Sequence, residues 1–350
     1  MAMRLNSRQR GQLLTEFHQH TGRTKVVLTV DTEPSIAGAF ANPSQAPLLH
    51  EPVAGEVNGR SEALGFMIET LSRCDLTATF FVETVHTRFF GTLAMGGYVE
   101  RLVRAGQDVQ LHLHPNWLSF ADGHLRPGPP HTDNCRDMSV KSLGALISEG
   151  ADQIRSWTGQ RPSAMRTGNF STAQSVFQAM REAGLRFSSN ICMAMAPPPE
   201  RELAVTGGVY EVASVRELPV TCFADVGPIG RGRFRAMQVT AVTSREMINI
   251  LDTAHACGNS IVVIVTHPFE FLKKRDFRYA GLRPNRLVQH RFRRLCAFLA
   301  ENSERFEVLP IAAAAEALDP PQSWTELRGN GLRSVLRTAE NVINDHLFFL

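Results

Sequence analysis

The chain lacks any hydrophobic run that could cross a membrane, since none of its apolar stretches approaches the roughly 18 residues needed. Its polar and basic start, residues 1–10, is not followed by the apolar segment of a secretory signal. Its six cysteines are scattered without a C-x-x-C pair, which favours reduced thiols over a disulfide framework. These absences predict a cytoplasmic protein without stable membrane insertion.

The chain also lacks a strong excess of positive or negative charge, because its formal net charge is only +3. The arginines between residues 283 and 294 form a basic cluster, but without the aromatic pattern of a nucleic-acid groove. A solvated helix face explains this cluster better, so no nucleic-acid partner is predicted. The 43% hydrophobic content is that of a soluble globular protein, while the length leaves open one large domain or two smaller ones.

Three apolar runs, within residues 25–34, 108–115 and 261–268, end in residues suited to chemistry. A run of β-branched residues that stops at a charged residue and a proline is typical of a buried parallel strand. Such strands deliver carboxylates and imidazoles to their C-terminal edge: Asp31, Glu33, His112, His114 and His267. These groups supply the metal ligands and the titratable acid and base of a metal-assisted hydrolase.

Helix-like segments alternate with the strands, because apolar residues recur at helical spacing between them. Regular β–α alternation with buried strands predicts an α/β fold of parallel (β/α) type, whose chemistry lies at the C-terminal ends of the strands. Arg166, which ends a short strand predicted at 163–166, reaches the same edge. We therefore expect residues 25–318 to form a single (β/α)-barrel-like domain.

The last part of the chain, residues 319–350, changes character after Pro320-Pro321. Its apolar residues recur at about 3.6-residue spacing: Leu332, Val335, Leu336, Ala339, Val342, Ile343 and Leu347. This stripe predicts an amphipathic helix that packs on the barrel or on a second subunit, with docking to a membrane surface as a less favoured alternative. Residues 1–24 are assigned to an N-terminal extension, and a homo-oligomer stays open.

Spacing within the strands brings the candidate residues together. Residues two apart in a strand point to the same face, so Asp31 converges with Glu33, and His112 with His114. Two imidazoles and a carboxylate, with one position left for water, form a catalytic zinc-type centre, and a second carboxylate can deprotonate that water. Each motif alone is a weak signal, since satisfied or surface histidines also explain it. Their shared edge of one predicted sheet favours the functional interpretation.

In this order the motifs resemble those of the polysaccharide deacetylase (NodB-homology) superfamily of carbohydrate esterases. The family's T-F-D-D resembles T-V-D-T-E at 29–33, and its G-H-E-I-x-x-H-T-x-x-H-P resembles G-Q-D-V-Q-L-H-L-H-P at 106–115. Its R-x-P-x-G resembles Arg166-Thr-Gly168, and its apolar strand ending in histidine resembles residues 261–267. The resemblance spans roughly residues 25–311 and looks closest to the WalW-like branch.

The resemblance implies a distorted seven-stranded (β/α) barrel that binds a divalent metal. Thr32 stands where the family has its metal-binding second aspartate, so that role passes to Glu33, beside His112 and His114. The implied metal is Zn²⁺, with Co²⁺, Ni²⁺ or Mn²⁺ as alternatives. An exchange of roles between Asp31 and Glu33, or metal binding by both, stays open.

The resemblance also implies an acid and a base. Asp31 would take the proton of the attacking water, Arg166 would orient Asp31, and His267 would protonate the leaving amine. Either Glu270 or Asp225 is expected to hold the proton on His267.

The chain departs from the family pattern elsewhere. Its two motif histidines are two apart rather than four, which demands extended backbone, and the proline of the third motif is missing. The fourth motif is not recognisable, and residues 217–220 or 223–225 are candidates for it. Trp117, Phe170 and Phe269 could stack on a sugar, or pack in the core.

The implied function is removal of an N-acyl, most simply acetyl, group from an amino-sugar or glycan-precursor substrate. Without an export signal, a soluble or lipid-linked precursor fits better than a cell-wall polymer. Alternatives are a deformylase or a cyclic-amide C–N hydrolase with the same ligands, or a catalytically inactive carbohydrate-binding protein.

Overall fold

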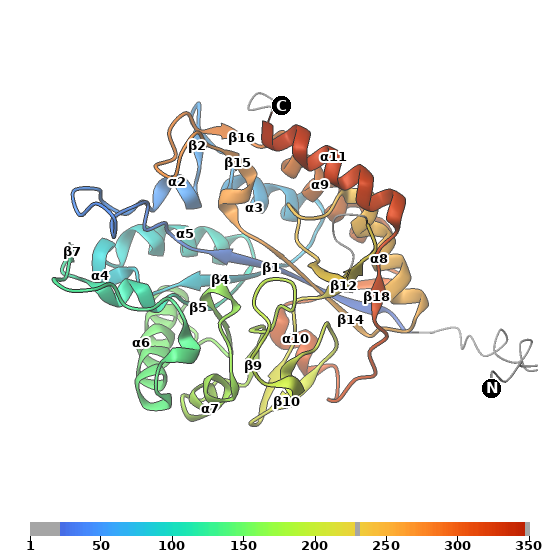
Figure 1. The fold of residues 1–350 in the computed structure, drawn as a ribbon, viewed down its shortest axis with the longest axis horizontal. Helices are drawn as coiled ribbons and strands as arrows, with labels where there is room; N and C mark the ends of the chain where they lie inside the picture. The colour runs from blue at the N-terminus through green and yellow to red at the C-terminus, as the bar shows by residue number, and fades with distance from the viewer. Residues whose placement is uncertain (1–21, 228–231, 347–350) are drawn as a thin grey trace, which may run out of the picture.

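The computed structural model describes residues 22–227 and 232–346 (Figure 1). Most of the predicted N-terminal extension, and Leu347 of the C-terminal stripe, lie outside these residues. Within them, no helix is both long enough and apolar enough to span a bilayer.

A curled, nine-stranded sheet forms the centre of the fold (Figure 1). Its strands follow the order β10 (Tyr210–Val212), β11 (Val215–Glu217), β9 (Phe187–Ser188), β8 (Ala164–Thr167), β5 (Asp108–Leu113), β4 (Thr79–Glu83), β1 (Thr24–Thr32) and β14 (Ile261–Thr266), with β17 (Phe306–Val308) paired to the start of β1. All pairs are parallel except the β10–β11 hairpin.

The sheet curls toward closure beside β14. The amide of Val220 donates to the carbonyl of Ile191 at 2.9 Å, and the amide of Thr221 donates to the carbonyl of Val263 at 3.0 Å. The segment after β11 therefore links the region after β9 to β14. The α/β class and the distorted (β/α) barrel are confirmed. The sheet has nine strands rather than the predicted seven, because β10, the outer strand of the β10–β11 hairpin, and β17 extend it.

The helices that cover the sheet are amphipathic, and the longer ones begin at good caps. Ser139 and Thr243 each accept a hydrogen bond from the backbone amide three residues later. The helices are α2 (His50–Val53), α3 (Leu64–Arg73), α4 (Thr87–Phe90), α5 (Leu93–Arg104), α6 (Val140–Thr158), α7 (Gln174–Glu182), α8 (Ser244–Ala256), α9 (Arg286–Glu301), α10 (Ile311–Glu316) and α11 (Gly331–His346).

Alternating strand positions divide the core into two layers. Val26 and Leu28 of β1 join the larger cluster, which packs beneath the helices. Val27 joins a second cluster with Phe81 of β4 and Val263 of β14, on the concave side of the sheet. Residues at the strand ends that are an even number of positions from these side chains therefore also face into the barrel.

Smaller elements complete the fold. They are the pairs β2 (Glu56–Val57) with β3 (Arg60–Ser61), β6 (Phe120–Ala121) with β7 (His124–Leu125), and β15 (Leu272–Lys273) with β16 (Arg283–Pro284), and a small sheet of β12 (Cys222–Asp225), β13 (Arg233–Ala236) and β18 (Leu327–Arg328). Strand β18 lies just before α11 in the chain, and its pairing with β12 attaches this part of the chain to the domain.

The C-terminal helix α11 exists as predicted, but its orientation contradicts the expectation that its apolar stripe packs on the barrel. Its polar residues Ser334 and Arg337 are buried against the domain, whereas Leu332 is 71% exposed and Leu336 is 55% exposed. The buried guanidinium of Arg337 has to be paired, and this requirement turns the polar face inward.

Candidate metal and acid–base site

The register of the sheet places the candidate residues at the C-terminal ends of its strands, on the concave face. His112 pairs with Arg166 across β5 and β8, and Asp31 lies at the end of β1. These strands, β1, β5, β8 and β14, end around a cavity of about 240 Å³. Its walls are Asp31, Glu33, His112, His114, Asn169, Phe170, Met195 and His267. Arg166 is fully buried behind this cavity.

Three side chains form a group that could hold a metal ion. One ligand atom from each of Glu33, His112 and His114 lies within 4.8 Å of the others. The Nε2 atom of His112 is 3.0 Å from Oε2 of Glu33, and the Nε2 atom of His114 is 2.6 Å from the same oxygen. The extended backbone at His114 explains how two histidines only two residues apart reach one point.

The outer nitrogen of each imidazole is fixed by an acceptor. Nδ1 of His112 lies 2.8 Å from the carbonyl oxygen of Arg166, which can only accept, so Nδ1 carries the proton. Nδ1 of His114 lies 2.9 Å from the carboxylate of Asp133. In the neutral rings, two Nε2 lone pairs thus converge on the Glu33 carboxylate. This donor set fits a divalent cation, and such acceptors typically orient ligand histidines.

The charges of this group are strongly coupled. Burial alone would raise the pKa of the Glu33 carboxyl, but His114 and His112 outweigh burial and hold that pKa well below its usual value. Burial alone would lower the pKa of His114, but the carboxylates of Glu33 and Asp133 raise it well above the usual value. The group therefore favours a charged carboxylate and a protonated His114, so a cation that binds here would take the place of the proton on Nε2 of His114.

Asp133 is a residue that sequence analysis missed. It lies in an irregular segment between β7 and α6, and Asn169 also donates to its carboxylate at 2.8 Å. Asn169 has a φ of 54°, in the left-handed region that asparagine tolerates better than most residues. No periodicity marks a loop carboxylate, so only the fold reveals its contact with His114.

The ring of His114 explains why the third motif, Arg166-Thr-Gly168, ends in glycine. A Cβ atom on this residue would lie 2.4 Å from Nδ1 of His114 and 2.5 Å from its Cε1, so only glycine leaves room for the ring.

We expect Gly168→Ala to displace His114 and to lower metal affinity roughly 10–100-fold, the range typical of disturbed ligand support. The measurement is equilibrium dialysis against Zn²⁺. The matched control is Gly97→Ala, where a Cβ atom would have no neighbour within 4 Å. Unchanged affinity in Gly168→Ala would show that His114 is not a ligand.

Asp31 and Arg166 form a buried ion pair at 2.7 Å. Nη1 of Arg166 also donates to Oγ1 of Thr29, while Nε and Nη2 donate to the carbonyl and hydroxyl of Ser189. Its guanidinium also lies 4.5 Å from the ring centroid of Phe81. The arginine is therefore held rigidly, and it fixes one oxygen of Asp31, leaving the other toward His267.

His267 lies between two carboxylates. Its Nε2 atom is 3.7 Å from Oδ2 of Asp31, and its Nδ1 atom is 2.9 Å from Oε1 of Glu270. Burial alone would lower the pKa of His267, but Glu270, then Asp31 and Glu33, raise it to about 9. Of the two predicted partners, Glu270 is correct. Asp225 is not, since it binds elsewhere.

The expected fourth motif does not reach the cavity. Glu217 is buried and accepts hydrogen bonds from Ser188 and from the backbone amides of Asn190 and Ile191. Asp225 instead pairs with an arginine of α11. Glu217 therefore supports the barrel wall, and Asp225 supports the docking of α11 on the small sheet.

Of the three predicted stacking residues, only Phe170 lines the central cavity. Phe269 and Trp117 line an adjoining cavity of about 300 Å³, which shares Glu33 and His114 with the first. Trp117 is 1% exposed, so core packing accounts for it. Phe269 stacks on the His267 ring with centroids 4.8 Å apart. Met195 in the central cavity was not anticipated.

No protein-family model and no curated protein matches the chain. Among solved structures, a proposed polysaccharide deacetylase from Mycobacterium smegmatis is 13% identical, and the match covers 88% of this chain and 96% of that chain with a TM-score of 0.50. A family 4 acetyl xylan esterase from Clostridium thermocellum, in complex with a cobalt ion, is 12% identical, with coverages of 84% and 91% and a TM-score of 0.38. A family 4 carbohydrate esterase from Streptomyces lividans, in complex with acetate, is 14% identical, with coverages of 81% and 90% and a TM-score of 0.37.

The match to the Mycobacterium smegmatis structure spans nearly the whole of both chains, so it concerns the complete barrel rather than one motif. At this identity the likeness speaks for the fold alone, and the resemblance to the WalW-like branch stays a prediction. The chain has the fold of the polysaccharide deacetylases.

Proposed function

We propose that this chain is a metal-dependent hydrolase that removes an N-acyl group, acetyl in the simplest case, from an amino-sugar substrate. The observation that carries the proposal is a single cavity that combines three kinds of group. They are the Glu33–His112–His114 set, the arginine-held carboxylate of Asp31, and the carboxylate-held imidazole of His267.

Glu33, His112 and His114 would hold the cation, with Zn²⁺ as our first choice for a site of two imidazoles and one carboxylate. When bound, such a cation would polarise the attacked acyl carbonyl and lower the pKa of a water molecule.

Asp31 is proposed as the general base. Arg166 occupies its Oδ1 atom, so Oδ2 is the oxygen available for a proton from water. The charge and rigidity of Arg166 keep the carboxylate in one orientation, which is what a positioned base needs.

His267 is proposed as the general acid. Glu270 holds its Nδ1 proton, so Nε2, which faces Asp31, is the nitrogen that would deliver a proton to a leaving amine. An amide nitrogen departs poorly without protonation, so this group matters most for an N-acyl substrate.

The likeness to the Mycobacterium smegmatis protein, described as a proposed polysaccharide deacetylase, supports an acylated carbohydrate as substrate, and the proton donor His267 supports an N-acyl linkage and hence an amino sugar. The adjoining cavity, walled by Phe269 and Tyr279 with Lys274 nearby, offers aromatic and polar contacts for a neighbouring sugar.

The test combines metal content with product release. After loading with Zn²⁺ and dialysis, elemental analysis should find bound zinc, and a panel of N-acetylated amino sugars should release acetate. The paired control is the double variant His112→Ala, His114→Ala, which should lose both. Formate release instead of acetate would identify a deformylase. Bound metal without either product, or no metal at all, would contradict the proposal.

Glu270 offers a test of the acid through pH. Because this carboxylate raises the pKa of His267, the protonated imidazole persists to higher pH in the native protein. In Glu270→Gln the pKa should fall, so the alkaline limb of the rate profile should move to lower pH.

The measurement is kcat against pH on an amide substrate for both proteins. Asp225→Asn serves as the comparison variant, because Asp225 has no contact with His267 and should leave the alkaline limb in place. An unmoved limb in Glu270→Gln would mean that another group titrates there.

A further inference from the structure

Helix α11 packs on the domain through its polar face. Arg337 and Ser334 are buried, and Arg337 is ion-paired to Asp225 at 2.5 Å and to Glu246 at 2.6 Å. Asp225 also accepts from Ser334 at 2.9 Å. This paired cluster fixes the rotation of the helix about its axis, since turning it would leave buried charges without partners.

The apolar face of α11 consequently points away from the domain. Its large side chains are between half and nearly three-quarters exposed: Leu332 71%, Val335 49%, Leu336 55%, Val342 50% and Ile343 50%. They follow the three- and four-residue spacing of a single helical stripe. A contiguous exposed stripe of this kind marks an interaction surface rather than scattered surface residues.

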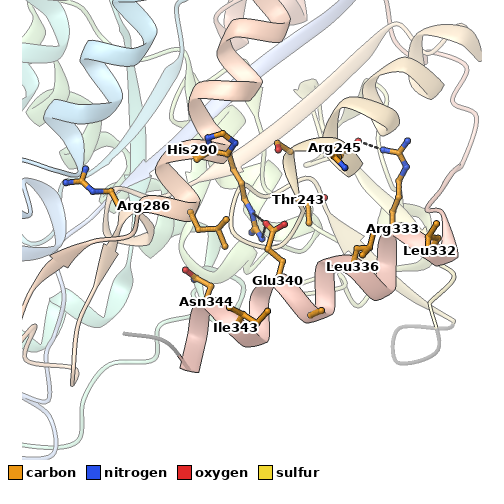
Figure 2. Close-up of a pocket in the computed structure, with 14 residues that line it drawn as sticks. Thr243, Arg245, Arg286, His290, Leu332, Arg333, Leu336, Glu340, Ile343 and Asn344 are labelled. Carbon is orange, nitrogen blue, oxygen red and sulfur yellow. Dashed lines mark hydrogen bonds and ion pairs between the residues drawn. The ribbon is translucent and has the colours of Figure 1, made fainter. Parts of the chain in front are cut away.

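A groove of about 1000 Å³ runs beside this stripe, between α11 and the N-terminal parts of α8 and α9. Figure 2 shows Leu336 and Ile343 on α11 and His290 on α9 along the groove, with the side chain of Arg286 turned away from α11. Its cationic or basic side chains are Arg245, Arg286, His290, Arg291 and Arg333.

Acidic groups are nearly missing from this groove. Among the described residues that line it, Glu340 is the one carboxylate, and it is paired with Arg291 at 2.5 Å. Arg286 is 59% exposed but is ion-paired with Glu62 at 3.3 Å, whereas Arg245 and Arg333 have no carboxylate partner among the described residues. The surface thus combines aliphatic side chains with an excess of positive charge.

We propose that α11 and this groove dock on the surface of an anionic lipid bilayer. Aliphatic side chains of an amphipathic helix enter the boundary between headgroups and acyl chains, and neighbouring arginines bind anionic headgroups. A second copy of the chain fits less well. Two-fold packing on this face would bring the same cationic residues close to their own copies.

The position of α11 suits a flat surface. The helix lies along the outer edge of the molecule (Figure 1), and the large side chains of its stripe are about half exposed or more. The sequence that follows, L-F-F-L at 347–350, has the composition of interfacial anchors. The inference does not rest on the proposed reaction.

Docking would also hold the candidate site near the headgroups. The Nζ atom of Lys273 in β15 donates to the carbonyl of Asn344 in the last turn of α11 at 3.0 Å. Only the short turn at Pro268–Phe271 separates β15 from His267. A substrate carried on a lipid would therefore arrive close to the cavity.

The experiment is co-sedimentation of the full chain with two kinds of vesicle. One kind is phosphatidylcholine alone, and the other contains phosphatidylglycerol at one lipid in three. We expect binding to the anionic vesicles, much weaker binding to the neutral ones, and a fall in binding as salt rises. Equal binding to both, or binding to neither, would overturn the proposal.

Two double variants separate the apolar and the charged contributions. Leu336→Asp with Ile343→Asp should lower partitioning at least roughly tenfold, because each change removes an inserted aliphatic side chain. Arg245→Gln with Arg333→Gln should lower it roughly fivefold for each arginine, and should reduce the salt dependence.

The matched control lies on α5, where Leu93 is 89% exposed and Arg104 is largely exposed. Leu93→Asp with Arg104→Gln should bind vesicles as the native protein does. Circular dichroism and thermal unfolding check that each variant is folded. Native-like vesicle binding by Leu336→Asp with Ile343→Asp would overturn the proposal. So would a native dimer, seen by sedimentation velocity, that this variant loses, since a second copy would then cover the stripe.

Discussion

Replacing Asp31 by asparagine is expected to lower kcat roughly 10²–10⁴-fold, while the bound metal stays at its native level. The amide cannot take a proton from water, but it occupies the same volume beside Arg166. Glu33, His112 and His114 keep their positions, so the cation keeps its ligands. The measurement pairs acetate release with metal analysis of the same protein sample.

Glu33→Gln is the natural comparison, because it removes charge at the oxygen that both imidazoles approach. It should lower metal occupancy first, and its activity should partly recover when excess metal is supplied. Asp31→Asn should not recover in this way. If the two variants show the reverse phenotypes, then Asp31 is the ligand and Glu33 is the base.

The second large effect concerns His267 and depends on the leaving group. For an amide substrate the departing nitrogen must be protonated, so His267→Ala should cost roughly 10²–10⁴-fold in rate. For an activated ester such as a nitrophenyl acetate, the leaving oxygen departs without a proton, so the same variant should lose far less. The measurement is kcat/KM on both substrates between about pH 5 and 9, across which a histidine can titrate.

A variant that keeps the ring position filled helps to interpret the result. His267→Gln should behave like His267→Ala on the amide if proton donation is what matters. Because the native pKa of His267 is raised to about 9, the native rate should fall as pH rises through that region, and both variants should lack this fall. Equal losses on amide and ester would mean that His267 positions the substrate instead.

The barrel, and the sheet edge that carries the candidate site, could be predicted from the sequence. Strands β1 and β14 are buried along almost their whole length. Their β-branched runs, K-V-V-L-T-V and I-V-V-I-V-T, can therefore be recognised as buried strands from the local sequence alone. Because strand side chains alternate with a strict period of two, the spacing of Asp31 with Glu33, and of His112 with His114, placed each pair on one face.

Some partners of those residues could not be predicted, because they come from segments distant in sequence and without a periodic pattern. Asp133 reaches His114 from a loop, and Arg166 offers its carbonyl to His112 from a neighbouring strand. The choice of Glu270 over Asp225 was likewise decided by the fold, because the turn after β14 places Glu270 beside His267, whereas strand β12 directs Asp225 to Arg337 of α11.

The sequence by itself predicted an amphipathic helix within residues 319–350, because periodicity is a local property, and residues 331–346 form it. Only the tertiary structure decided which face turns inward. Arg337 finds Asp225 on β12 and Glu246 on α8, two carboxylates about 90 to 110 residues away in the chain. Turning the stripe inward would carry Arg337 into solvent and deprive the buried Asp225 and Glu246 of their shared cation, and such uncompensated buried charge costs more free energy than several exposed methyl groups.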